Sequence, residues 1–176
     1  MDGNNDFQGI VGYSSNISAF VIGFRGSSNI PNWINDFTVL KEKVYEAYPE
    51  ALVHQGFYQL YQQVAEQVVH HVQEIHNEHA NAVILVTGHS LGGVIAMICA
   101  FELALLHGLD VEALHTFGQP RVGNYAFAKA VEDLMPKLYR VIHKQDIVVH
   151  FPPTNFAFRH SGIEVRNLLQ IFVSNS

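Results

Sequence analysis

The chain has 176 residues, of which 48% are hydrophobic, and its formal net charge at pH 7 is −6. This length suits one domain with a sizeable core. The acidic balance argues against a nucleic-acid partner, because no basic stripe is present to displace phosphate counterions. No segment has the roughly 18 uninterrupted apolar residues of a membrane span, and the first residues lack the regions of a signal peptide. Cys99 is the single cysteine, so an intramolecular disulfide is excluded and the compartment stays open.

The first half of the chain predicts a hairpin, a loop and a helix. Two apolar runs, residues 8–13 and 17–24, flank the turn-forming residues 14–16 and indicate a β-hairpin. Residues 25–32 are polar and contain glycine and proline, which is typical of a loop. Apolar residues recur at helical spacing between residues 57 and 76, so we expect a helix with one apolar face there.

The second half alternates strands with helices. Residues 82–87 are apolar almost throughout and predict a strand covered on both faces. The helix after Ser90 is apolar nearly all round and ends at Gly108, while a second helix runs from an N-cap at Asn124 to Met135. Strands are expected at residues 111–117, at 138–143 and within 157–172. This order predicts one α/β domain over residues 1–176, with a mostly parallel sheet, helices on both faces and an antiparallel N-terminal hairpin.

The most informative motif is the hexapeptide of residues 88–93, which lies between a buried strand and a buried helix. Its sequence is Gly-His-Ser-Leu-Gly-Gly, and it places Ser90 on a sharp strand-to-helix turn. In such a nucleophile elbow the serine hydroxyl is exposed at the carboxyl end of the sheet. Gly88 and Gly92 lack side chains, so the strand and the helix can approach closely around the turn. The motif therefore predicts acyl transfer through a serine ester; the alternative is a glycine-rich turn without chemistry.

Several further motifs extend this interpretation along most of the chain, from about residue 9 to residue 165. They are Phe24-Arg25-Gly26-Ser27-Ser28, Asn32-Trp33, Val53-His54-Gln55-Gly56-Phe57, Gly118-Gln119-Pro120-Arg121-Val122-Gly123-Asn124, and Asp146 followed by Phe151-Pro152-Pro153. In this order, and together with the elbow, the sequence resembles the class 3 (fungal-type) lipase family of α/β-hydrolases. The resemblance implies an α/β-hydrolase fold, here a truncated one that lacks the family's N-terminal helix and its C-terminal segment with the catalytic histidine.

The resemblance also implies roles for individual residues. Ser90 is the nucleophile, and the backbone N–H groups of Leu91 and Ser27 form the oxyanion hole, to which the Ser27 hydroxyl is a possible addition. Asp146 is the acid that orients the catalytic imidazole, and it follows a predicted strand at the carboxyl edge of the sheet. An ordinary polar turn is the alternative for Ser27, and a turn or cap residue for Asp146. His54 and residues 118–124 match motifs that support the loops around the serine.

Residues 30–37 align with the family's lid. Ile30, Trp33, Ile34 and Phe37 lie at i, i+3, i+4 and i+7 and form one face of a helix. Such a helix can cover the serine in water, or turn its apolar face towards lipid and open the site. A core-packing helix is the alternative, and Trp33, which suits a lipid–water boundary, favours the lid.

The base that should activate Ser90 is not apparent. After Asp146 the chain offers His150 and His160. The segment from Phe158 to Glu164 matches a strand motif of the family whose histidine is not the base, and the family's catalytic histidine comes later than any position in these 176 residues. Either the sequence is a fragment of a longer lipase, or it is a relative without the base.

We therefore expect a serine hydrolase that cleaves acylglycerol esters at a lipid–water interface. The alternatives are an inactive lipid- or protein-binding module, a phospholipase A1 and a small-ester esterase. No organic cofactor is expected. We also expect no metal, because His70, His71, His76 and His79 lack the spacing of a His-Glu-x-x-His site, and a solvated helix end is the simpler interpretation. The family resemblance suggests a secreted or lumenal protein. Acyl length, head group, regiochemistry and oligomeric state are not fixed by the sequence.

Overall fold

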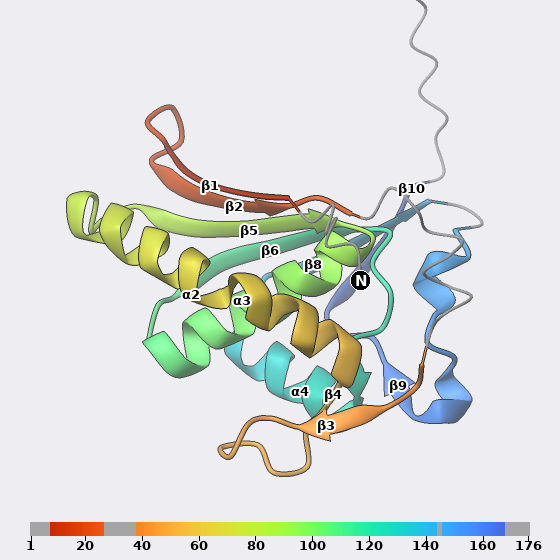
Figure 1. Ribbon diagram of the computed structural model, residues 1–176. Coiled ribbons are helices and arrows are strands. Elements are labelled where there is room, and N and C mark those ends of the chain that lie inside the picture. The colour runs from red at the N-terminus through yellow and green to blue at the C-terminus, as the bar shows by residue number, and fades with distance from the viewer. Residues whose placement is uncertain (1–7, 27–37, 144–145, 168–176) are drawn as a thin grey trace, which may run out of the picture.

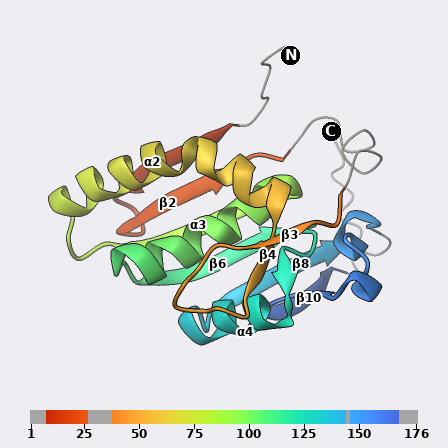
Figure 2. The same ribbon diagram turned by 60° about the horizontal axis from the view of Figure 1, so that its bottom comes forward.

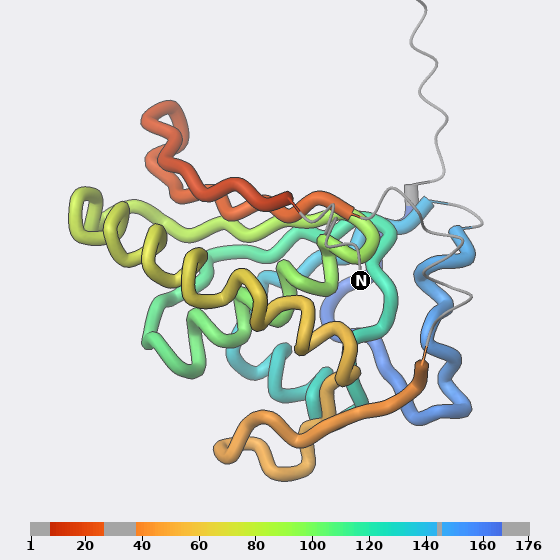
Figure 3. Tube along the Cα trace, in the orientation of Figure 1, coloured from red at the N-terminus to blue at the C-terminus, as the bar shows by residue number. Residues whose placement is uncertain are grey.

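The computed structural model describes residues 8–26, 38–143 and 146–167. Its main sheet has six strands in the order β1 (Gly9–Ser14), β2 (Ala19–Phe24), β5 (Val83–His89), β6 (Val111–Phe117), β8 (Leu138–His143) and β10 (Ile163–Asn167). Only the β1–β2 pair in this sheet is antiparallel. The predicted hairpin and the mostly parallel sheet are thus confirmed, and Figure 3 shows the hairpin in red along one edge.

The described residues form three α-helices beside this sheet. They are α2 (Gln55–Glu78), α3 (Leu91–His107) and α4 (Tyr125–Leu134). The expected caps form: Gly108 ends α3 in the left-handed conformation at φ 63°, and the side-chain oxygen of Asn124 accepts from the Phe127 N–H at 2.9 Å. None of the described helices is long and apolar enough to cross a membrane.

All three helices lie on the same face of the six-stranded sheet (Figures 1 and 2). We expected helices on both faces, but in the described part of the chain the α-helices lie on one face alone. On β5 the side chains alternate: Ile84 and Val86 are buried under α3, whereas Val83 is 40% exposed. The apolar run at residues 82–87 therefore does not by itself indicate burial on both sides of the sheet.

The core lies between the sheet and α3. Residues 91–103 of α3 are all buried, as its all-round apolar sequence predicts. They pack on inward-facing strand residues such as Phe20, Ile22 and Leu114. Cys99 is fully buried here, and burial raises the pKa of its thiol, so it acts as a small apolar residue.

A small second sheet flanks the helices. It consists of β3 (Lys41–Lys43), β4 (Leu52–His54), β7 (Gly123–Asn124) and β9 (Phe158–Arg159). Two 3-10 turns, Val148–His150 and Thr154–Phe156, lie between β8 and β9. This sheet brings the start of α2 together with the chain that follows Asp146.

Candidate active site

Ser90 connects β5 to α3 on a strained turn. Its backbone has φ 52° and ψ −123°, a conformation that costs a residue with a side chain about 1–3 kcal/mol. The Ser90 N–H donates to the Phe117 carbonyl at 2.8 Å, and the Ser90 carbonyl accepts from the Gly93 N–H at 2.9 Å. The predicted elbow is therefore present, and hydrogen bonds to β6 and to the first turn of α3 hold it.

The two glycines beside the serine are required by close backbone contacts. A Cβ atom added at Gly88 would lie 2.2 Å from the Gly92 carbonyl oxygen. One added at Gly92 would lie 2.3 Å from the Phe24 carbonyl oxygen at the end of β2. Both distances are far below van der Waals contact, so the strand and the helix meet around Ser90 only because these positions lack side chains.

The oxyanion-hole prediction is partly within the described structure. Leu91 is the first residue of α3, so its N–H belongs to the positive end of the helix dipole. Gly26 lies against the elbow: a Cβ there would be 2.7 Å from the His89 carbonyl oxygen and 3.1 Å from Ser90 Cβ. Ser27, together with the lid residues Ile30, Trp33, Ile34 and Phe37, lies outside the described residues.

Asp146 lies beyond the carboxyl end of β8 and is half-buried. Its N–H donates to the His143 carbonyl at 2.9 Å, and its Oδ1 accepts from the Val148 N–H at 2.9 Å. Its Oδ2 faces Gly118, where an added Cβ would lie 2.7 Å from this oxygen. Gly118 directly follows Phe117, whose carbonyl holds Ser90. The serine and the acid are therefore supported by neighbouring residues at the end of β6.

Neither histidine that follows Asp146 is arranged as a base. His160 Nε2 is 2.8 Å from the Val149 carbonyl oxygen, so this nitrogen carries the proton and donates it. Burial, with Arg140 as a second cause, lowers the pKa of His160 to about 3. An imidazole this reluctant to bind a proton is a poor proton acceptor at neutral pH. His150 is exposed, and its carbonyl accepts a hydrogen bond from Arg121.

The structure also shows how two of the sequence motifs support the site. Arg121 donates from its backbone to the Phe151 carbonyl at 2.7 Å and from Nη1 to the Pro152 carbonyl at 2.7 Å. It thereby fixes the loop that follows Asp146, a role that its motif alone did not reveal. His54 caps α2 by accepting from the Phe57 N–H at 3.2 Å, while Nε2 donates to the Thr38 carbonyl at 2.5 Å. Burial lowers the pKa of His54, which agrees with this neutral form.

Sequence and structure comparisons give one consistent result. The family described as "Lipase (class 3)" matches residues 21–156. The lipase of Rhizomucor miehei is 38% identical over 162 residues, which are 90% of this chain and 44% of that protein. Secreted mono- and diacylglycerol lipase 1 of Fusarium solani is 34% identical over 165 residues, 88% of this chain and 49% of that protein. The chain thus spans about half the length of the curated relatives it matches.

A solved structure agrees with these sequence matches. It is a triacylglycerol lipase whose catalytic centre is described as a serine protease triad. It shares 38% sequence identity with this chain at a TM-score of 0.85, and the match covers 92% of this chain and 62% of that one.

Proposed function

This chain belongs to the class 3 lipase family, and from that premise we propose that it hydrolyses carboxylic esters of acylglycerols through an acyl-enzyme on Ser90. The observation that carries the proposal is the strained elbow, which fixes Ser90 between the end of β5 and the positive end of α3. Strain of this kind at a serine is typical of a nucleophile. The names of the relatives, which act on tri-, di- and monoacylglycerols, support this substrate class.

The proposed reaction begins when Ser90 Oγ attacks the ester carbonyl. The Leu91 N–H stabilises the oxyanion, and each such donor contributes about 10²–10³-fold in rate. We assign the second donor to Ser27, because the preceding residue, Gly26, lies against Ser90 Cβ. The ester C–O bond then breaks, and the alcohol leaves with the proton that Ser90 Oγ has lost. Water hydrolyses the acyl-enzyme, which releases the carboxylic acid and restores the Ser90 hydroxyl.

In this proposal the Asp146 carboxylate orients the catalytic imidazole. Its Oδ1 is occupied by the Val148 N–H, which leaves Oδ2 as the acceptor for an imidazole N–H. We do not assign the base to His160, because its Nε2 proton is committed to the Val149 carbonyl. Residues 30–37 remain the proposed lid.

A fluorophosphonate probe tests the nucleophile directly, since it reacts with activated serines. We expect stoichiometric labelling of Ser90, loss of labelling in Ser90→Ala, and retention in Ser161→Ala, a control at a second serine that is equally 2% exposed. Wild type and Ser161→Ala should also hydrolyse a short-chain p-nitrophenyl ester, and Ser90→Ala should not. Labelling of wild-type protein no greater than that of Ser90→Ala would overturn the proposal.

A second candidate function is a lipid-binding module without turnover. The observation behind it is that His160, whose Nε2 donates to the Val149 carbonyl, is not placed as a base. Binding to phosphatidylcholine–triacylglycerol emulsions without ester hydrolysis would support the module, whereas hydrolysis that depends on Ser90 would exclude it.

A further inference from the structure

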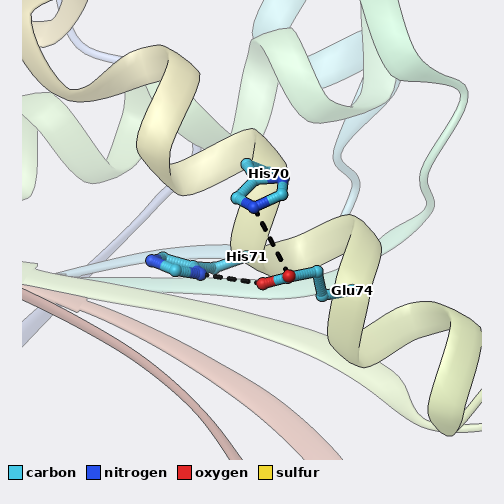
Figure 4. A group of neighbouring side chains, drawn as sticks. All are labelled: His70, His71 and Glu74. Carbon is cyan, nitrogen blue, oxygen red and sulfur yellow. Dashed lines mark hydrogen bonds and ion pairs between the residues drawn. The ribbon is translucent and has the colours of Figure 1, made fainter.

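Helix α2 carries a cluster of three metal-ligating side chains, none of which belongs to the elbow. His70, His71 and Glu74 occupy positions i, i+1 and i+4, and Figure 4 shows both imidazole rings directed at the Glu74 carboxylate. The His70 Nε2–Glu74 Oε1 distance is 3.4 Å, and the His71 Nδ1–Glu74 Oε2 distance is 3.1 Å. Residues three and four apart lie on the same side of a helix, so Glu74 reaches both histidines.

We propose that His70, His71 and Glu74 form a binding site for a divalent transition-metal ion such as Zn²⁺. Two imidazoles and one carboxylate are a ligand set that zinc accepts, with open positions completed by water. The sequence predicted no metal site because His-Glu-x-x-His spacing is absent. The structure shows that Glu74 takes the i+4 place that a second histidine holds in that motif.

The ligand atoms are already close to a coordinating arrangement. One atom from each residue can be chosen so that no two are more than 4.8 Å apart. Zinc–ligand bonds of about 2.0–2.2 Å place tetrahedral ligands about 3.4 Å from one another. Each imidazole nitrogen already lies at about this distance from one of the two Glu74 oxygens, 3.4 Å from Oε1 and 3.1 Å from Oε2. Small rotations of the three side chains would bring both nitrogens and a single carboxylate oxygen around one ion.

Little opposes this small movement. The three side chains are 56–66% exposed, so rotating them disturbs no core packing. Within the described part of the chain, their polar contacts are with one another. His71 also borders a cavity of about 620 Å³ between β1 and α2, lined on its other sides by residues such as Val11, Phe24 and Val64. Because the three side chains are more than half exposed, water can complete the coordination of a bound ion.

Titration calorimetry of the tag-free protein with ZnCl₂ tests the site. We expect one Zn²⁺ per chain and no heat with MgCl₂, because Mg²⁺ prefers oxygen ligands. His71→Ala and Glu74→Gln should each weaken binding at least about tenfold. The matched controls His107→Ala on α3 and Asp133→Asn on α4 remove exposed side chains from other helices, and they should bind like wild type.

Circular dichroism of every variant establishes that the fold is retained, as expected for exposed positions. Backbone amide NMR provides a second readout, in which Zn²⁺ should shift resonances around residues 70–74. Equal affinity of wild type and His71→Ala, or Zn²⁺-dependent shifts confined to other parts of the chain, would overturn the proposal. Neither result depends on whether Ser90 is active.

Discussion

Replacing Gly118 with alanine should displace the Asp146 carboxylate, and Gly108 provides a matched control. Both glycines have positive φ, 56° and 63°, so alanine costs about 1–2 kcal/mol of stability at either position. They differ in their surroundings. A Cβ at Gly118 would lie 2.7 Å from Asp146 Oδ2, whereas one at Gly108 would have nothing within 4 Å.

The size of the displacement follows from that contact. Real Cβ contacts rarely fall below the range 3.0–3.4 Å, so Oδ2 and the new methyl group must separate by 0.3–0.7 Å. Catalytic groups need placement to within about 0.5 Å, and a 1 Å error costs about 10²-fold. Gly118→Ala should therefore slow reaction of Ser90 about 4- to 25-fold, and Gly108→Ala should leave it within about twofold of wild type.

The rate of fluorophosphonate labelling measures this effect, and thermal unfolding measures the shared backbone cost. The Val148 amide resonance reports on the acid without requiring turnover, because this N–H donates to Asp146 Oδ1 at 2.9 Å. It should shift in Gly118→Ala and stay in place in Gly108→Ala. If both variants are labelled at the same rate and the Val148 amide does not move, the inferred support of Asp146 by residue 118 is wrong.

Three further predictions concern buried groups. Ser90→Gly should unfold with a free energy about 1 kcal/mol higher than Ser90→Ala in chemical denaturation, because glycine tolerates φ 52°; equal stabilities would mean that the elbow is unstrained. Folding lowers the pKa of His160 from 6.5 to about 3, so the unfolded chain binds a proton at this residue before the folded protein does, and stability is lost as pH drops below 6.5. Between pH 7 and 5 the free energy of unfolding of the wild type should fall by up to about 2 kcal/mol more than that of His160→Gln, and Ser90 should be labelled equally in both proteins. Burial raises the pKa of the Glu102 carboxyl above 4.5. The protonated carboxyl therefore contributes stability below pH 4.5, and this contribution is lost as pH rises through the raised pKa of the folded state. Glu102→Gln stays neutral and still accepts from the Tyr45 hydroxyl, so it should melt higher than wild type at pH 7.5 and equally at pH 4.

Most large elements were predictable because their patterns are long and regular. The strands at residues 111–117 and 138–143 form with the expected bounds, and the helix expected at 57–76 forms as Gln55–Glu78. The expected strand at 82–87 continues to His89, because Gly88 and His89 still pair with Thr116 and Phe117. The strands of the small sheet have two or three residues, too few for an alternating pattern.

The site was predictable only as far as its motifs reach. The elbow depends on local sequence, so Ser90 and its flanking glycines could be found without a structure. The contact between Gly118 and Asp146 joins residues 28 positions apart, and no periodicity signals it. The state of His160 depends on burial beside Arg140 and on the Val149 carbonyl, both of which arise from tertiary packing. The grouping of His70 and His71 around Glu74 depends on side-chain directions that a spacing rule for histidines does not capture.

The carboxyl end of β6 is the structural link between nucleophile and acid. Phe117 accepts the Ser90 N–H, while the Gly118 N–H donates to Val141 on β8 at 2.9 Å and its Cα faces Asp146. β8 in turn leads to Asp146, whose N–H returns to the His143 carbonyl. Because one short segment contacts both groups, a shift of β6 relative to β5 would change the distance between Ser90 and Asp146. The rigidity of the parallel sheet at this point is therefore part of the catalytic apparatus that we propose, and changes at residues 117 and 118 should affect both groups together.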